Sequence, residues 1–317
     1  EGMMGKQPLQ VLLAKPRGFC AGVMRAVDIV DRALMKFDEP VYVRHEIVHN
    51  KTVVENLKAK GAIFVEELDD IPDGAVTIFS AHGVSRKVED GAEQRGLSVI
   101  DATCPLVSKV HNEAQRYSRK GYEIVLIGHR GHPEVVGTTG QVPGKVHLVS
   151  TLEDVALLEP KDSDKLAYVT QTTLSVDDTR HIIDALRNRF PEIVGPDVKD
   201  ICYATQNRQS AVRMMVDHAD VILVVGAHYS SNSNRLREIG EEAGVSSYLI
   251  PDADALEPDW LKGAKIVGVT AGASAPEELV LGLVERLSEL YDVSVKDFEA
   301  IEENVQFKLP KELADVV

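Results

Sequence analysis

Short apolar runs rich in β-branched residues alternate with longer amphipathic segments along most of the chain. Val11–Ala14 is one such run, and the segment after Cys20 places Val23, Val27 and Val30 on one helical face. This alternation is typical of parallel α/β units, in which a helix connects each strand to the next parallel strand. The pattern therefore predicts an α/β fold.

The order of elements recurs three times, and each recurrence begins with a cysteine that follows an apolar run. Cys20 and Cys104 lie 84 residues apart, and Cys202 follows 98 residues later. Each repeat has two further polar turns, which are marked by His49, His132 and Ser231 for the first turn and by His82, Thr172 and Ser274 for the second. Their similar separations indicate repeated supersecondary units.

We interpret the repeat as three α/β domains related by a pseudo-threefold axis, each with a small sheet of four mostly parallel strands. The predicted parts are an N-terminal strand and turn over 1–21, domains over 22–104, 105–198 and 199–290, and a C-terminal return segment over 291–317. The third repeat fits least well, because Gly195 and Pro196 interrupt the apolar run before Cys202.

The nine turns share a position that favours ligand binding. Open parallel sheets bind ligands beyond the carboxyl ends of their strands, and all nine turns are predicted to lie at such ends. Cys20 also comes directly before a predicted helix, where backbone N–H groups and the helix dipole stabilise the negative charge of a thiolate. Three domains of this kind would direct their turns at one centre.

Three cysteines at one centre would suit an iron–sulfur cluster, because soft thiolates select iron–sulfur clusters or zinc. They would leave a four-iron cluster one ligand short, with an open iron that acts as a Lewis acid. Two alternatives stay open at this point. One is a zinc site built from the same cysteines, and the other is three buried cysteines that bind nothing.

The same turns gather hydrogen-bond donors at predicted helix starts, which makes them a natural cradle for an anion such as phosphate. The donor residues are His49, Asn50, His82, Gly83, His132, Ser230, Ser231, Asn232 and Ser274. Helix capping alone would explain any one of them, and Ser274 is expected to cap the helix that follows it. Glu134 adds a carboxyl group whose pKa would rise in a partly dry site, and Thr172 adds a hydroxyl.

Composition narrows the class of protein further. The chain has 317 residues, 44% of them hydrophobic, and a net charge of −15, which argues against nucleic acids and anionic membranes as partners. Three cysteines are too few for a secreted disulfide framework. The first eight residues contain no apolar signal core, and no run approaches the ~18 apolar residues of a membrane span. We therefore expect a cytoplasmic protein.

Nine short motifs resemble, in order, those of one enzyme family. They are Pro16–Val23, His45–Asn50, Phe79–Val84, Asp101–Val107, Gly131–Glu134, Thr170–Ser175, Ile201–Thr205, Ser230–Arg235 and Val269–Ser274. From Val11 to Leu313 the chain is similar to the 4-hydroxy-3-methylbut-2-enyl diphosphate reductases, the last enzymes of the methylerythritol phosphate route to isoprenoids.

The resemblance implies a trefoil of three α/β domains around a 4Fe–4S cluster held by Cys20, Cys104 and Cys202. It implies reductive removal of the allylic hydroxyl of (E)-4-hydroxy-3-methylbut-2-enyl diphosphate, which gives isopentenyl and dimethylallyl diphosphates. The substrate hydroxyl would bind the fourth iron, and a ferredoxin or flavodoxin would supply electrons one at a time. We also expect a monomer.

The resemblance further implies roles for the turn residues. Glu134 would be the proton source, relayed with His132, and Thr172 would complete the hydrogen-bond network of the substrate hydroxyl. The diphosphate would be held by His49, His82, His132, Ser230, Ser231, Asn232 and Ser274. Two residues beside the motifs, Tyr229 and Val136, depart from the pattern of the family; they flank motif residues and concern the local shape of two turns, not the chemistry.

Two other functions use the same features. A redox-neutral hydro-lyase would use the open iron without an electron donor, so turnover in the absence of a reductant would favour it. An iron–sulfur redox sensor or electron carrier would not need the anion cradle, so tight diphosphate binding would count against it.

Overall fold

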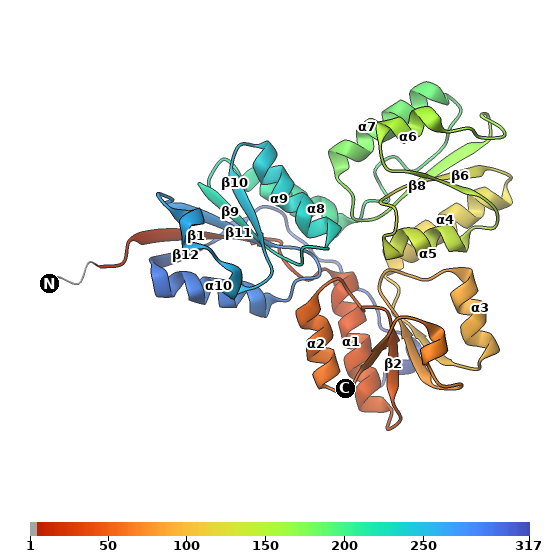
Figure 1. The fold of residues 1–317 in the computed structure, drawn as a ribbon, viewed down its shortest axis with the longest axis horizontal. Coiled ribbons are helices and arrows are strands. Elements are labelled where there is room, and N and C mark those ends of the chain that lie inside the picture. Colours follow the sequence, from red (N-terminus) through yellow and green to blue (C-terminus); the bar gives the residue numbers. More distant parts are fainter. Residues whose placement is uncertain (1–4) are drawn as a thin grey trace. The chain divides into compact units, whose positions relative to one another are not determined.

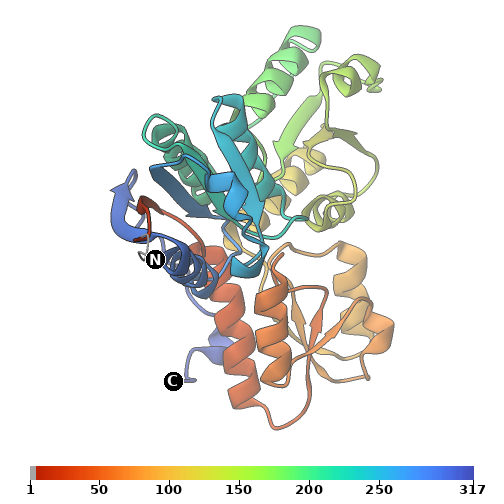
Figure 2. The ribbon, with the colours of Figure 1, turned by 60° about the vertical axis from the view of Figure 1, so that its left-hand side comes forward.

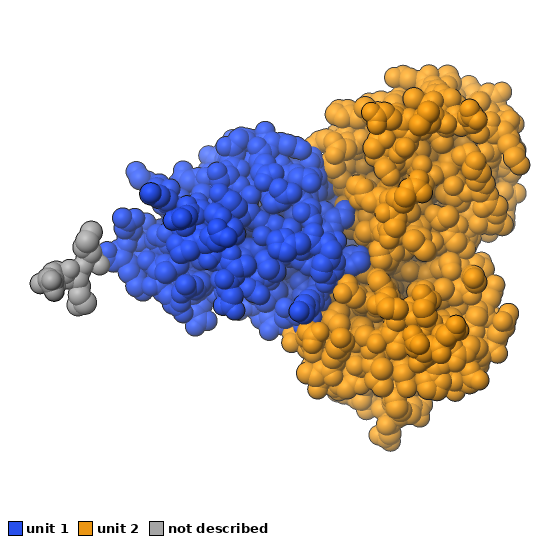
Figure 3. All heavy atoms as spheres, viewed as in Figure 1, with its two compact units in different colours: residues 1–20, 49–53, 203–305 blue, residues 21–48, 54–202, 306–317 orange. Residues whose placement is uncertain are grey.

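The computed structural model describes residues 5–317 and consists of alternating strands and helices (Figure 1). The first four residues lie outside the described residues. They belong to the predicted N-terminal segment 1–21 and to the first eight residues, in which the sequence predicts no signal core. The chain forms two compact units (Figure 3). Unit 1 comprises Glu1–Cys20, His49–Val53 and Tyr203–Val305, and unit 2 comprises Ala21–Val48, Val54–Cys202 and Gln306–Val317.

Unit 1 contains one five-stranded sheet with the order β10-β9-β11-β1-β12, in which every pairing is parallel. Its strands are β1 (Pro8–Lys15), β9 (Val221–Val225), β10 (Ser246–Ile250), β11 (Ile266–Ala271) and β12 (Asp292–Glu299). Alternate residues of β9 face opposite sides of the sheet. Leu223 packs in the cluster of α10 (Glu277–Leu290), and Val224 packs in that of α8 (Tyr203–Met215) and α9 (Ser231–Glu242).

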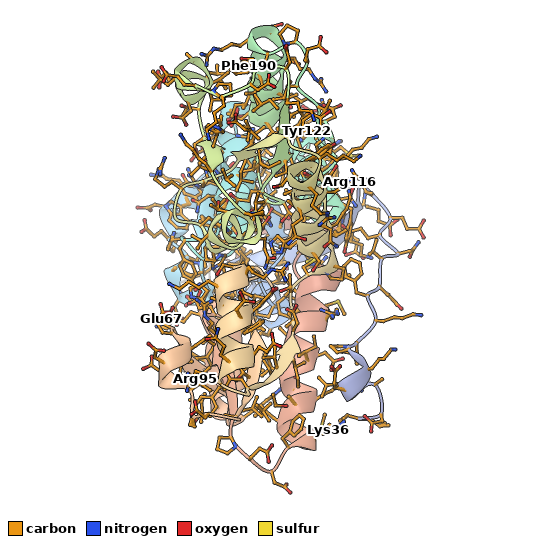
Figure 4. All side chains as sticks on the ribbon, turned by 90° about the vertical axis from the view of Figure 1, so that its right-hand side faces the viewer. Lys36, Glu67, Arg95, Arg116, Tyr122 and Phe190 are labelled. Atoms are coloured by element: carbon orange, nitrogen blue, oxygen red, sulfur yellow. The ribbon has the colours of Figure 1, made fainter. Side chains whose placement is uncertain are left out.

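Unit 2 contains a four-stranded parallel sheet with the order β3-β2-β4-β5. Its strands are β2 (Val41–Arg44), β3 (Ile63–Val65), β4 (Val76–Phe79) and β5 (Ser98–Asp101). The helices α1 (Ala21–Lys36) and α2 (Lys51–Ala59) lie on one side of this sheet, and α3 (Arg86–Gln94) lies on the other (Figures 1 and 2). Arg95, labelled in Figure 4, ties the end of α3 to Asp73 at 2.8 Å.

The second sheet of unit 2 has three parallel strands in the order β7-β6-β8. Its strands are β6 (Glu123–Ile127), β7 (Val146–Val149) and β8 (Leu166–Thr170), and its helices are α4 (Pro105–Arg119), α5 (Pro133–Gln141), α6 (Leu152–Leu157) and α7 (Val176–Arg189). Leu126 packs with residues of α4 and α5, whereas its neighbour Val125 packs with residues of α6 and α7. The sheet is therefore covered on both faces, as parallel sheets are.

The predicted α/β class with small parallel sheets is confirmed, but the strand count of four per sheet is wrong for two of the three sheets. The residues before Cys202 make only an isolated bridge, between Ala167 and Val194, because Gly195 and Pro196 end the extended segment. The return segment contributes β12, which pairs with β1 over eight residues and gives unit 1 its fifth strand.

Ser274 does not cap the following helix. α10 begins at Glu277 with Pro276 at the N-cap position and no side-chain cap. No helix within residues 5–317 combines the length and the apolar character that crossing a membrane requires.

Candidate functional site

The polar turns follow the carboxyl ends of parallel strands, as the sequence predicts. Eight of the nine come after a strand. The turns of Cys20 and Cys104 follow β1 and β5. The turns of His49, His132 and Ser231 follow β2, β6 and β9, and those of His82, Thr172 and Ser274 follow β4, β8 and β11. The turn of Cys202 follows only the bridge at Val194. The site residues therefore come from one edge of each sheet, where ligands of parallel sheets bind.

The three cysteines occupy equivalent positions in the repeats. The backbone N–H of Cys20 donates to the carbonyl of Ala273 at 3.2 Å, that of Cys104 to Ala81 at 3.0 Å, and that of Cys202 to Thr172 at 3.0 Å. Each acceptor is the second residue after a strand, namely β11, β4 or β8. This hydrogen bond is a structural signature of the repeat that spacing alone suggested.

Each cysteine stands directly before a helix, because α1 begins at Ala21, α4 at Pro105 and α8 at Tyr203. All three are half-buried and none forms a disulfide. Cys20 belongs to unit 1, whereas Cys104 and Cys202 belong to unit 2. Within residues 5–317 no three histidine, cysteine or acidic side chains are placed closely enough to hold a metal ion. The thiol groups of the cysteines and their positions before helices suit a soft metal centre, although the described residues do not form an assembled site.

Glu134 is a buried acid held by Thr172. Its side chain is 3% exposed and lies in the first turn of α5. The backbone N–H of Thr172 donates to Oε1 at 2.7 Å, and the Thr172 hydroxyl donates to Oε2 at 2.9 Å. Burial raises the pKa of Glu134 to about 7, against the lowering effect of these two bonds. Glu134 can therefore hold a proton near neutral pH, in the direction that the sequence predicts.

His132 caps the helix that carries Glu134. Its Nδ1 accepts the Glu134 backbone N–H at 3.2 Å, so Nδ1 carries no proton and the neutral ring has its proton on Nε2. The rings of His132 and His82 meet edge to face, with centroids 5.9 Å apart. Two donors expected to bind the diphosphate are thus neighbours in unit 2.

Glycines bring α5 close to the turn of His82. A Cβ on Gly140 would lie 2.2 Å from Cβ of Ser85, and one on Gly137 would lie 3.1 Å from the carbonyl oxygen of Gly83. Gln141 at the end of the helix donates to the carbonyl of Val84 at 2.6 Å. The second half of α5, the helix that His132 caps, therefore packs closely against the turn of His82.

Sequence reasoning missed Asp200, a buried acid close to this group. Its Oδ2 accepts the backbone N–H of Thr170 at 3.1 Å. Burial, followed by the neighbouring Glu113 carboxylate, raises the pKa of Asp200, and Asp200 in turn raises that of Glu134. Its position two residues before Cys202 was the only local signal, since its burial depends on residues distant in the sequence.

The start of α9 carries the serine and asparagine donors of unit 1. Ser230 is the N-cap residue and its hydroxyl oxygen accepts the Ser233 N–H at 3.3 Å, while Ser231 is the first helical residue. Asn232 is 5% exposed, and among residues 5–317 neither polar atom of its amide has a hydrogen-bond partner. A buried amide without hydrogen-bond partners lowers the stability of the fold, so its presence here suggests that Asn232 binds a ligand.

His49 and Ser274 meet in unit 1. The Ser274 hydroxyl donates to the His49 carbonyl at 3.1 Å. The His49 ring packs edge to face on Tyr229, with centroids 5.9 Å apart. Tyr229 and Val136, the two departures from the family pattern, are exposed by 51% and 57%, so both change the surface of their turns.

The predicted residues thus form two connected sets, one in each unit. In unit 1, Cys20 contacts the turn of Ser274, which reaches His49 and then Tyr229 beside Ser230. In unit 2, Cys104 contacts the turn of His82, which is followed by His132, Glu134, Thr172 and Cys202. Each set joins cysteine positions to anion donors, and the set in unit 2 also holds the acid.

The model of the LytB protein family matches residues 11–288. The 4-hydroxy-3-methylbut-2-enyl diphosphate reductase 1 of Rhodopseudomonas palustris is 63% identical over 304 residues, which cover 96% of this chain and 99% of that protein. The reductase 2 of Bradyrhizobium diazoefficiens is 64% identical over 307 residues, with the same coverage.

Solved structures give the same assignment. That of the E-1-hydroxy-2-methyl-but-2-enyl-4-diphosphate reductase from Plasmodium falciparum has a TM-score of 0.92 and 40% identity, and the match covers 98% of this chain and 97% of that one. A second reductase, described as the terminal enzyme of the non-mevalonate pathway, has a TM-score of 0.65 and 33% identity over 89% of this chain and 99% of its own. The chain therefore belongs to the LytB family of oxidoreductases, as the nine motifs in its sequence predict.

Proposed function

We propose that the chain reduces (E)-4-hydroxy-3-methylbut-2-enyl diphosphate to isopentenyl and dimethylallyl diphosphates, the last step of the methylerythritol phosphate pathway. The relatives that match this chain over almost their whole length carry the name of this reductase. The reaction takes up two electrons and two protons, breaks the allylic C–O bond, forms a C–H bond and releases water. It therefore needs a bound diphosphate, an electron source and a proton donor.

The observation that carries the proposal is the chain of contacts from Glu134 through Thr172 to Cys202. Thr172 gives both its N–H and its hydroxyl to the carboxyl of Glu134, and its carbonyl accepts the N–H of Cys202. These contacts support the proposal because they would link the proposed proton donor, through one residue, to the backbone of a proposed cluster ligand. Such positioning of a group with a pKa near 7 is what general acid catalysis requires.

We propose Cys20, Cys104 and Cys202 as the ligands of a 4Fe–4S cluster with one open iron. Three thiolates in equivalent turns suit this group better than zinc, which in structural sites takes four protein ligands. When bound, the cluster would supply electrons one at a time and a Lewis acid for the leaving oxygen. The residues of the chain bind, orient and protonate the substrate.

The diphosphate would be held by donors from both sets. His49, Ser230, Ser231, Asn232 and Ser274 belong to unit 1, and His82 and His132 belong to unit 2. Nδ1 of His132 accepts the Glu134 N–H, so Nε2 would carry the proton that His132 donates to a phosphate oxygen. The proton relay between His132, the diphosphate and Glu134 that the resemblance implies would go through Nε2 of His132, because Nδ1 accepts from the helix start.

A ferredoxin or flavodoxin is the proposed electron donor, since the reaction needs a reductant that delivers single electrons. We further infer a monomer that works in the cytoplasm, where thiols stay reduced. Purified protein with either donor, assayed for loss of the hydroxy-diphosphate, tests the first of these inferences. Turnover without any reductant would overturn the reductase assignment in favour of a hydro-lyase.

The deciding experiment is Mössbauer spectroscopy of protein labelled with iron-57 under anaerobic conditions, with and without the hydroxy-diphosphate. We expect a 4Fe–4S signal in which one iron is distinct and changes when the substrate is added. Serine in place of any one of the three cysteines should lower the iron content. Irons that ignore the substrate would indicate an electron carrier or sensor, and absence of iron after reconstitution would refute the cluster.

A further inference from the structure

Arg208 is a fully buried charged residue in unit 1 that none of the roles above uses. It lies on α8 and its side chain is 1% exposed. It occupies the apolar face of the helix, between Ala204 and Val212. A buried guanidinium is tolerated only where charge and hydrogen bonds compensate for the lost water.

The compensation for Arg208 comes from the turn that leads to Cys20. Nε donates to the carbonyl of Gly18 at 3.0 Å, Nη2 donates to the same oxygen at 2.8 Å, and Nη2 also reaches the carbonyl of Phe19 at 3.4 Å. Gly18 and Phe19 are the two residues directly before Cys20. The planar guanidinium thus forms hydrogen bonds with the backbone directly before this cysteine.

The remaining contacts of Arg208 connect this turn to two other segments. Nη1 donates to the carbonyl of Ala204, the second residue after Cys202, at 3.1 Å. It also forms an ion pair of 2.7 Å with Glu303, whose side chain is 16% exposed and accepts a further bond from Asn207 at 3.2 Å. Glu303 belongs to the return segment 291–317, for which the sequence indicates no chemistry.

We propose that Arg208 and Glu303 form a buried charge pair that positions the Cys20 turn and sets the reduction potential of the cluster bound there. This inference rests on the proposed function, because it requires a cluster. A charge in a low-dielectric interior acts strongly on a nearby redox centre. The cation favours the reduced, more negative state and raises the potential, and the carboxylate opposes it. Net charge is a known lever on iron–sulfur potentials.

The pair allows a test by the sign of the shift. Arg208→Gln removes the positive charge and should move the midpoint potential to more negative values. Glu303→Gln removes the negative charge but keeps an oxygen that can accept from Arg208, so it should move the potential to more positive values. Arg208→Lys keeps the charge without the planar fork, so its potential should stay nearer the parent value while the iron content falls.

The measurement is an anaerobic redox titration of the reconstituted protein, followed by electron paramagnetic resonance, with iron content determined in parallel and no substrate present. Arg237→Gln is the matched control, because Arg237 forms an ion pair of 2.7 Å with Glu241 on the surface of α9 in the same unit. This control should leave the potential unchanged.

Opposite shifts in Arg208→Gln and Glu303→Gln support the proposal. Shifts of the same sign, or none beyond the control, overturn it, because a purely structural role would alter both variants alike. If Arg208→Gln does not fold, the positive shift of Glu303→Gln decides the matter. A parent protein that binds no cluster would instead refute the proposed function, so the two failures are distinguishable.

Discussion

Glu134 combines two opposing influences on one carboxyl group. Its hydrogen bonds from Thr172 stabilise the ionised form, but complete burial destabilises that form more and raises the pKa to about 7. A group with this pKa is protonated below neutral pH and ionised above it. Its environment therefore suits a donor that gives up a proton during turnover and recovers it from the surroundings.

The pH dependence of turnover follows from this pKa. If the protonated form of Glu134 is the active one, kcat/KM should be level below pH 7 and fall about tenfold per pH unit above it. Glu134→Gln should lose most turnover while keeping its iron and its affinity for the substrate. The measurement is a pH profile of kcat/KM with excess reductant. Near-normal turnover of the glutamine variant would end the assignment of Glu134 as proton donor.

Asn232 offers a second test at the scale of one side chain. Its amide is buried with both polar atoms lacking partners among residues 5–317, a situation that costs about 1–3 kcal/mol. Asn232→Leu has a similar volume and no polar atoms. We expect this variant to unfold at a higher temperature than the parent and to bind inorganic diphosphate at least tenfold more weakly.

Calorimetry of binding and of thermal unfolding separates the two effects of Asn232→Leu. Leu236→Met, a swap of buried apolar residues of similar volume on the same helix, serves as the control and should leave binding unchanged. Lower stability together with normal affinity in the leucine variant would show that Asn232 is structural and does not bind a ligand.

At the scale of elements, helices and strands were predictable because their signals are local. The apolar run Val11–Ala14 and the helical spacing of Val23, Val27 and Val30 define β1 and α1 without reference to the rest of the chain. The predictions fail where contacts with distant segments determine whether a residue lies in a strand or caps a helix. β12 has mainly exposed residues and becomes a strand because β1 offers a parallel edge. Pro276 is the N-cap residue of α10, so Ser274 is available to donate to His49.

The contact between α5 and the His82 turn depends on the absence of a side chain at Gly140. Gly140→Ala would place a Cβ 2.2 Å from that of Ser85, so the helix and its His132 must shift. We expect a lower unfolding temperature and a KM for the hydroxy-diphosphate raised several-fold, with iron content unchanged, because no cysteine lies on this helix.

Gly282 provides a control for the Gly140 variant within another helix. It lies in α10, and a Cβ there would meet no atom within 4 Å. Gly282→Ala should therefore stabilise the protein by up to about 1 kcal/mol, the usual helix preference for alanine, and leave KM unchanged. Equal behaviour of the two variants would show that close packing at Gly140 does not position His132.

At the scale of the whole molecule, the repeat made much of the candidate site visible from sequence. It singled out one cysteine and two polar turns per repeat, and their equivalent strand-end positions were confirmed for eight of nine turns. Asp200, Arg208 and Glu303 escaped this reasoning. Their importance comes from burial and from contacts with residues such as Thr170 and Gly18, which no local pattern encodes.

The proposed cluster ligands are divided between the two units, since Cys20 belongs to unit 1 and Cys104 and Cys202 to unit 2. A cluster that binds all three would stabilise only molecules in which both units are folded. Binding would therefore couple the unfolding of the units. Each unit contains a buried apolar cluster of its own.

We expect the iron-loaded protein to unfold in one calorimetric transition and the protein stripped of iron under anaerobic conditions to unfold in two, both at lower temperature. Reconstitution should restore the single transition. Cys20→Ser should keep two transitions even after reconstitution, because it removes the only ligand supplied by unit 1. An iron-free protein that unfolds like the loaded one would mean that the cluster does not link the units, and the assignment of all three cysteines to one cluster would then fail.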